Sequence, residues 1–178
     1  SKFGAKFILK NNKNLPLKIC GNKNLKPIYY NEKKGSAQCK SAVILAGMRT
    51  EGITIIKAKK SRNHTELLSK YLKLPIKIKI KKNYDLIKIK KVNKIKKINY
   101  KIPSDISSSA FFMVLTALTK NAKLTIKNVN INSSRTGIIT ILTKMGVKIK
   151  YQNKKIYKGE KIADIIIESP KFIKPIKC

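Results

Sequence analysis

The chain has 178 residues and a hydrophobic content of 42%, which is enough to build a core and excludes a mainly disordered protein. Its 42 basic and 8 acidic residues give a formal net charge of +34 at pH 7, a balance that usually indicates nucleic acid or an anionic membrane as partner. The longest apolar run, residues 110–115, is far shorter than the about 20 residues that span a bilayer, and the first residues lack the apolar core of a signal peptide. We therefore expect a cytoplasmic protein that does not associate with a membrane.

The basic residues are spread along the chain and are almost all lysine. There are 39 Lys, 29 Ile and 15 Asn, but only three arginines, Arg49, Arg62 and Arg135. Proteins that read phosphates and bases favour Arg for its bidentate fork, whereas a bias toward Lys, Asn and Ile is typical of A/T-rich codons. Many lysines alternate with apolar residues and so coat the solvent faces of strands. We expect no nucleic-acid partner and keep a basic nucleic-acid-binding module as an alternative.

The cysteines do not form a recognisable framework. Cys20, Cys39 and Cys178 lie far apart without a CxxC pair, so neither a disulfide framework nor a zinc site is indicated. His64 is the only histidine and has no second His as co-ligand. We expect no metal and no cofactor.

The predicted elements begin with a helix at about residues 36–48, which is apolar on all sides from residue 42 to residue 46. The sequence ITII at residues 53–56 predicts a strand, and alternating Ile and Lys at residues 76–81 predict another. Between them lies an amphipathic helix, with one apolar face made by Leu67, Leu68, Tyr71 and Leu72.

The second half repeats this pattern. ITII lies over LTIK, residues 124–127, at an offset of 71 positions, and a second apolar helix is expected at about residues 107–119. A second amphipathic helix follows and ends at Gly146; its apolar face is made by Ile138, Ile141, Leu142 and Met145. Strict alternation in the strands predicts sheets with one solvated face. The fold class is therefore α/β, built from repeated units with sheets outside and buried helices inside.

The sequence GSAQCKSA, residues 35–42, opens the first apolar helix. The first N–H groups of a helix have no partner within the helix, and the helix dipole leaves partial positive charge there. With the hydroxyl of Ser36, these groups can bind an anion. Ser36 can instead be a simple N-cap, and the local sequence by itself favours that role.

The sequence SRNHTE, residues 61–66, opens the first amphipathic helix. In a chain so rich in Lys, Arg62 indicates a planar or bidentate contact that Lys cannot reproduce. Asn63 and Glu66 also fit the first and last positions of a capping box. His64 in this place is more often a surface or supporting residue than a metal ligand.

The sequences IPSDISSSAFF, residues 102–112, and NSSRTG, residues 132–137, open the two helices of the second repeat. Asp105 and the serines after it fit a turn followed by a helix cap. No glycine-rich nucleotide loop, HExxH motif or paired-Cys signature is present. We assign both segments to helix capping.

Taken in order, these motifs resemble those of the bacterial 5-enolpyruvylshikimate-3-phosphate synthases. The matching series is SAQ with KSA and AG, TI, SRxHTE, a Pro and DISS before two aromatic residues, N before RTG, MG, and a late GE with ADI. The resemblance implies an enolpyruvyl transferase fold of two globes made of βαβαββ units. Residues 1–102 would belong to the globe that binds shikimate 3-phosphate and residues 103–178 to the second globe. We expect the chain to be an internal fragment.

The resemblance also implies an activity, the transfer of the enolpyruvyl group of phosphoenolpyruvate to the 5-hydroxyl of shikimate 3-phosphate with release of phosphate. This reaction belongs to aromatic amino acid biosynthesis. Ser36, Ala37 and Gln38 would hold shikimate 3-phosphate, and Gln38 would also lie near phosphoenolpyruvate. The family's acid–base groups have no counterpart here, so the catalytic residues stay unknown.

The same resemblance places Ser61 and Arg62 on the phosphate of shikimate 3-phosphate and the ring of His64 close to the substrate. Three residues depart from the family pattern: Asn63 replaces Asp, Ser104 replaces Gly and Ser133 replaces Pro. Ser104 matters most, because a Gly there can serve a bend between the globes.

UDP-N-acetylglucosamine enolpyruvyl transferase shares the fold and stays an alternative, although SAQ together with SRNHTE belongs to the shikimate branch. We expect small-molecule substrates and a monomer when full length.

Overall fold

The computed structural model describes residues 2–11 and 14–176. The chain divides between Lys97 and Ile98 into two compact units, a few residues before the boundary that the sequence resemblance suggests. Cys178 lies outside the described residues. Among the described residues, no helix is long and apolar enough to cross a membrane.

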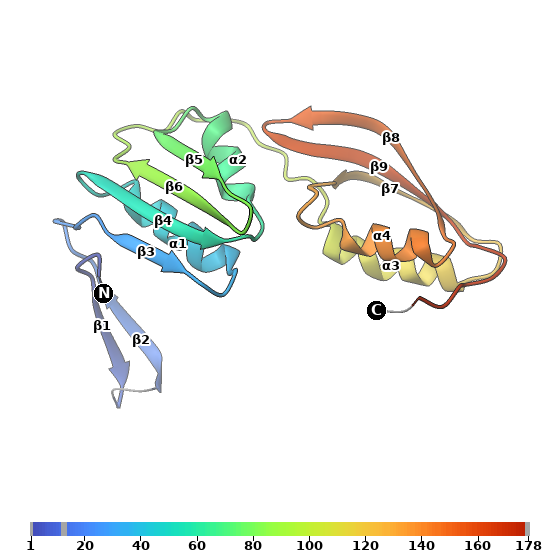
Figure 1. Cartoon of the computed structure of the whole chain (residues 1–178), viewed down its shortest axis with the longest axis horizontal. Coiled ribbons are helices and arrows are strands. Elements are labelled where there is room, and N and C mark those ends of the chain that lie inside the picture. The colour runs from blue at the N-terminus through green and yellow to red at the C-terminus, as the bar shows by residue number, and fades with distance from the viewer. Residues whose placement is uncertain (1, 12–13, 177–178) are drawn as a thin grey trace. The chain divides into compact units, whose positions relative to one another are not determined.

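The first unit begins with an antiparallel hairpin of β1 (Lys6–Lys10) and β2 (Asn14–Cys20). Its main sheet has the order β3-β4-β6-β5. These strands span Tyr29–Glu32 (β3), Ile53–Lys59 (β4), Ile76–Ile80 (β5) and Tyr84–Lys90 (β6). β3 is parallel to β4 and the other pairs are antiparallel. The helices α1 (Ala37–Gly47) and α2 (His64–Tyr71) lie on one face of this sheet (Figure 1).

The second unit has the same topology. Its elements are α3 (Ile106–Leu118), β7 (Lys123–Asn130), α4 (Gly137–Lys144), β8 (Lys148–Tyr157) and β9 (Glu160–Glu168). The sheet order is β7-β9-β8, and both pairs are antiparallel. Ser104 forms a parallel bridge with Val129 of β7, in the position that β3 has beside β4. The internal repeat predicted from the sequence is therefore confirmed.

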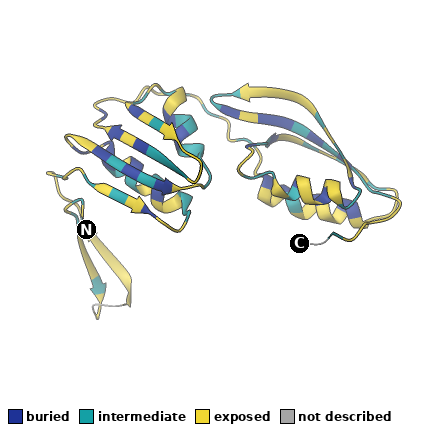
Figure 2. Cartoon of the chain, viewed as in Figure 1, coloured by how far each residue is buried: buried dark blue, intermediate teal, exposed yellow. Residues whose placement is uncertain are grey.

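Each sheet buries the face that its helices cover (Figure 2). On β4 the burial alternates, with Thr54, Ile56 and Ala58 buried between more exposed neighbours. The hydrophobic core of the first unit joins Ile56 and Ala58 to Ile44 of α1 and Ile87 of β6. The sequence prediction of sheets with one solvated face is confirmed.

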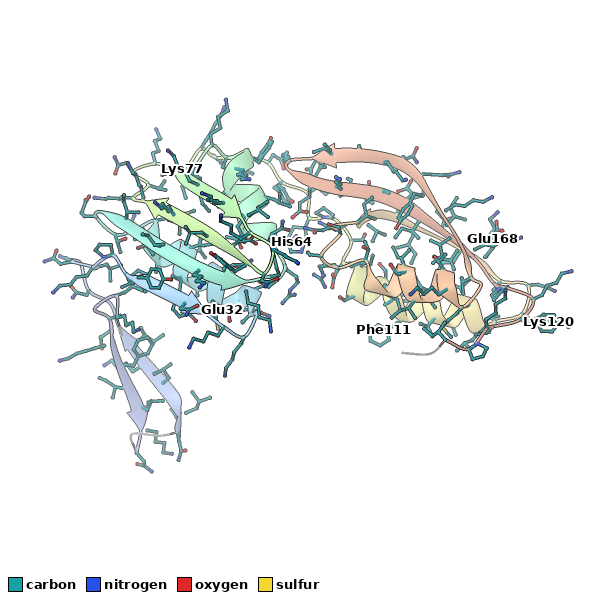
Figure 3. The ribbon with its side chains drawn as sticks, viewed as in Figure 1. Glu32, His64, Lys77, Phe111, Lys120 and Glu168 are labelled. Atoms are coloured by element: carbon teal, nitrogen blue, oxygen red, sulfur yellow. The ribbon has the colours of Figure 1, made fainter. Side chains whose placement is uncertain are left out.

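The two apolar helices are buried on the side that faces their own sheet and exposed on the opposite side within the described residues. The side chain of Phe111 on α3 is 79% exposed, and its ring points away from the sheet (Figure 3). Leu115 and Leu118 on α3 and Leu45 on α1 are also exposed. One sheet covers only one side of a helix, so the opposite side of these helices stays open.

The apolar face predicted for α2 is partly wrong. Tyr71 is exposed, whereas the polar residues Glu66 and Ser69 are the buried residues of this helix. The reason lies in α1, because a lysine of that helix meets Glu66 and turns the polar side of α2 inward. On α4, Ile141 is likewise exposed, while Ile139 and Leu142 are buried.

Candidate functional site

The loop between β3 and α1 is shaped by Glu32. This residue, labelled in Figure 3, ends β3. It is 4% exposed, and its carboxylate accepts hydrogen bonds from the N–H groups of Lys34 at 2.9 Å and Gly35 at 2.8 Å. Gly35 has φ +76°, a conformation that favours glycine. A Cβ at Gly35 would lie 3.3 Å from the carbonyl oxygen of Lys60. The start of α1 is thus held against the segment that leads into α2.

The N-terminus of α1 has the geometry of an anion-binding end. The hydroxyl of Ser36 accepts a hydrogen bond from the N–H of Cys39 at 3.2 Å, and the Ser36 carbonyl accepts one from the N–H of Lys40 at 3.1 Å. Among the described residues, no acceptor is paired with the N–H of Ala37 or Gln38. The first turn contains no acidic residue. These donors and the helix dipole favour an anion at this end.

The segment before α2 carries the second group of predicted site residues. Ser61, Arg62 and His64 are all half-buried, and α2 begins at His64 (Figure 3). Asn63 occupies the N-cap position as predicted, but its side chain does not make the capping hydrogen bond. Glu66 pairs with α1, so the two residues do not form the predicted capping box through the side chain of Asn63.

Lys40 joins the two helices. Its ammonium group lies 2.6 Å from Oε1 of Glu66 and donates a hydrogen bond to the carbonyl oxygen of Arg62 at 2.8 Å. The side chains of Lys40 and Glu66 are 1% and 5% exposed. A further hydrogen bond of 2.6 Å connects the hydroxyls of Ser41 and Thr65. These contacts bring the residues predicted at the start of α1 close to those before α2.

The hydroxyl of Ser61 adds a polar group to this place. Its Oγ is buried, and no described residue is its hydrogen-bond partner. A buried polar group without a partner costs about 1–3 kcal/mol, so such groups are normally satisfied by water or a ligand. Ser61 is therefore a candidate for direct contact with a bound anion.

Tyr30, on β3 next to this loop, remains a neutral phenol. Burial raises the pKa of Tyr30, and the neighbouring Cys39 and Glu32 raise it further. Tyr30 therefore contributes no negative charge that would oppose an anion at the start of α1.

The equivalent helix of the second unit is closed to an anion. Asp105 is the N-cap of α3 and accepts a hydrogen bond from the N–H of Ser107 at 3.3 Å. Arg135 lies 2.9 Å from the carboxylate of Asp105 and also donates to the hydroxyl of Ser107. The carboxylate occupies the position that an anion would take, which confirms the capping role predicted for this segment.

Ser104 fits its place without a special conformation. Its hydroxyl donates to the carbonyl oxygen of Lys127 at 3.0 Å, and its backbone pairs with β7. A serine is thus accommodated where the family pattern has glycine.

Sequence reasoning did not identify the roles of Lys40, Glu32 and Glu66. Lys40 stands in the apolar sequence of α1, and a charge on a helix that packs into a core is the signal that could have revealed a buried partner. No comparable signal marks Glu32, because its partners are backbone N–H groups of a loop.

Comparison with known proteins shows which family the chain resembles. The family model for EPSP synthase (3-phosphoshikimate 1-carboxyvinyltransferase) matches residues 1–176. The 3-phosphoshikimate 1-carboxyvinyltransferase of Caldicellulosiruptor bescii is 42% identical over 171 residues, which cover 95% of this chain and 39% of the relative. That of Leuconostoc mesenteroides is 40% identical over 170 residues, with 95% of this chain and 38% of the relative covered.

A solved structure of EPSP synthase from Acinetobacter baumannii superposes with a TM-score of 0.80 at 37% identity and covers 98% of this chain and 39% of that protein. This chain therefore spans about two fifths of the length of the relatives it matches. With the family model matched over residues 1–176, the chain belongs to the EPSP synthase (3-phosphoshikimate 1-carboxyvinyltransferase) family.

Proposed function

We propose that this chain supplies the shikimate-3-phosphate half of the active site of an enzyme that transfers the enolpyruvyl group of phosphoenolpyruvate to the 5-hydroxyl of shikimate 3-phosphate. Phosphate is the second product. The observation that carries this proposal is the meeting of two helix starts: the open N-terminus of α1, and the segment with Ser61 and Arg62 before α2.

The residues at this place suit a dianionic phosphate. The N–H groups of Ala37 and Gln38 and the hydroxyl of Ser36 offer neutral donors at the positive end of a helix dipole. Arg62 offers a planar cation that can bind two phosphate oxygens, and Ser61 offers a buried hydroxyl.

The exposed side chain of Gln38 is the group that we assign to both substrates. We place the ring of His64 next to the substrate at the start of α2. Neither residue is assigned a proton-transfer role.

The chemistry requires acid and base groups, because the methylene carbon of phosphoenolpyruvate gains a proton and the attacking hydroxyl loses one. The resulting tetrahedral intermediate breaks down when its methyl group loses a proton and its phosphate leaves, which restores the carbon–carbon double bond. We assign no residue of this chain to these proton transfers. The role of the chain in our proposal is binding and orientation of the two anionic substrates.

The remaining expectations belong to the same proposal. The functional protein would be a cytoplasmic monomer that uses small-molecule substrates without a cofactor and without a nucleic-acid partner. The scarcity of Arg and the spread of Lys along the whole chain support the last point.

A chimaeric enzyme tests the function. Residues 1–176 replace the matching segment of the Caldicellulosiruptor bescii relative, and phosphate release from phosphoenolpyruvate is measured with and without shikimate 3-phosphate. We expect release that depends on shikimate 3-phosphate and is not supported by UDP-N-acetylglucosamine. Gln38→Ala should lower turnover by about tenfold, which corresponds to ~1.4 kcal/mol of lost transition-state stabilisation.

The matched control is Gln152→Ala on β8, where the side chain is exposed on the second unit. This variant should keep the turnover of the unchanged chimaera. A folded chimaera that releases no phosphate, or that prefers UDP-N-acetylglucosamine, contradicts the proposed function.

A further inference from the structure

Lys40 has an environment that no other lysine of the described residues shares. It is 0% exposed, whereas every other described lysine is at least partly accessible. Burial of an ammonium group is costly and is tolerated only with close partners. Lys40 has two, the carboxylate of Glu66 and the carbonyl of Arg62.

Stability alone does not explain the buried ion pair of Lys40 and Glu66. A buried ion pair can often be replaced by apolar side chains of similar size without loss of stability, because desolvation offsets the attraction. The neighbouring side of α1 packs in an apolar core that could accept such side chains. The hydrogen bond from Lys40 to the carbonyl of Arg62 is different, because an apolar side chain cannot replace it.

This hydrogen bond holds a backbone that has few other restraints. Among the described residues, the backbone groups of Ser61 and Arg62 make no other hydrogen bond. Both residues lie between the end of β4 and the start of α2, outside regular structure. Lys40 therefore holds the Arg62 carbonyl toward α1, between the flanking contacts of Gly35 with Lys60 and of Ser41 with Thr65.

We propose that Lys40 is a positioning residue that holds Arg62 beside the N-terminus of α1, so that the guanidinium group and the helix end can bind the same phosphate. Glu66 neutralises the ammonium group and makes its burial possible. The proposal rests on the proposed function for its ligand but on the structure alone for its geometry. Lys40 itself does not touch the substrate.

The geometric part is tested in the 178-residue chain by NMR relaxation of the backbone amides. The variant Lys40→Met with Glu66→Leu removes both charges and keeps the apolar volume. We expect the order parameters of residues 60–64 to fall from the about 0.85 of a rigid backbone to below about 0.6, because the restraining hydrogen bond is lost, while the thermal midpoint changes little. The control is Lys91→Met with Glu51→Leu, an ion pair of the same residue types in the same unit that is 43% and 79% exposed. It should leave the order parameters of residues 60–64 unchanged.

A second variant tests the role of Glu66. Glu66→Gln leaves the buried ammonium group of Lys40 without its counter-charge, so it should lower the thermal midpoint more than the double variant does. An equal or smaller loss in Glu66→Gln contradicts the neutralising role of Glu66. If the double variant at Lys40 and Glu66 does not fold, Lys40→Gln with Glu66→Gln replaces it, because the shorter Gln at position 40 does not reach the Arg62 carbonyl. Unchanged order parameters in residues 60–64 in the folded variant that lacks Lys40 overturn the proposal.

The functional part is tested in the chimaera. Loss of Lys40 in the double variant should raise the KM for shikimate 3-phosphate by about tenfold, with less than a twofold change in the KM for phosphoenolpyruvate. A merely structural defect would lower the active fraction and kcat and leave both KM values unchanged. If the chimaera without further substitutions is inactive, the proposed function is refuted but the geometric role of Lys40 is not. If the chimaera is active and the double variant has the same KM for shikimate 3-phosphate, the role of Lys40 is refuted.

Discussion

Arg62 is one of three arginines in a chain with 39 lysines, and in our proposal it binds the phosphate through a planar fork that Lys lacks. Its carbonyl is fixed by Lys40, and among the described residues its guanidinium forms no ion pair. The planar fork is thus available for a phosphate at the start of α1.

We predict that Arg62→Ala weakens shikimate 3-phosphate binding to the chimaera by ~1–3 kcal/mol, because a charge-assisted contact is lost. Arg62→Lys should weaken binding less than Arg62→Ala but should not reach the affinity of the unchanged chimaera, because Lys lacks the planar fork. Isothermal titration calorimetry measures the dissociation constants. Arg49→Ala, at an exposed position after α1, is the control, and an unchanged dissociation constant in Arg62→Ala would count against the assignment.

At the scale of elements, the contact between α1 and β4 depends on a glycine. A Cβ at Gly47 would lie 3.0 Å from the Cβ of Thr54 and 3.2 Å from its Cγ2 and Oγ1, and Thr54 is fully buried. We predict that Gly47→Ala lowers the free energy of unfolding by ~1–3 kcal/mol, because the helix must move away from the sheet. Urea unfolding followed by circular dichroism measures this loss.

The matched control for that substitution is Gly137→Ala at the start of α4. A Cβ at Gly137 has no neighbour within 4 Å, so the change should alter stability by less than about 1 kcal/mol. Equal effects of the two substitutions would show that the contact with Thr54 is not what limits the size of residue 47.

Asp164 of β9 holds two irregular strands in place. Its carboxylate accepts hydrogen bonds from the N–H of Asn128 at 2.7 Å and from the amide of Asn153 at 2.7 Å. The pairing registers of β7 and β8 shift at these two places. The hydrogen bonds from Asn128 and Asn153 hold the pKa of Asp164 below its usual value.

The lowered pKa of Asp164 determines in which direction the stability of the folded chain changes with pH. A carboxylate whose pKa is lower in the folded state stabilises that state above its unfolded pKa, and the contribution is lost as pH falls through the folded pKa. We predict that Asp164→Asn lowers the thermal midpoint at neutral pH, and that its difference from the unchanged chain shrinks as the pH falls below about 4. Glu51→Gln, an exposed site, is the control. A difference that is the same at neutral and strongly acidic pH contradicts this account.

At the scale of the whole molecule, the charge of +34 creates a field that attracts any polyanion. We predict that duplex DNA is retained at low salt and released steeply as salt rises, with a dissociation constant weaker than about 1 μM at physiological salt. A filter-binding titration measures it. Tight binding at physiological salt that survives Arg62→Ala would instead support the nucleic-acid-binding alternative.

The apolar sides of α1 and α3 that face away from the sheets are exposed to solvent. In each unit the main sheet covers one side of the helices. The chain spans 39% of the length of its relative from Caldicellulosiruptor bescii. A sequence pattern shows that a helix is apolar on all sides but not which segment covers each side. The helix itself was predicted, but the exposure of Phe111 and Leu118 follows from the packing of the unit and not from the sequence pattern.

The sequence by itself determined the repeated α/β topology, the alternating strands and the helix starts at Ser36 and Asp105. These features depend on local periodicity and on hydrogen bonds between residues close in sequence. The candidate site was identified by the order of its motifs. Its geometry was decided by the tertiary structure, because Lys40 meets Arg62 and Glu66 only after α1 and α2 pack on one sheet. Contacts between residues more than twenty positions apart leave no periodic signal, and this is why the buried lysine emerged from the fold rather than from the sequence.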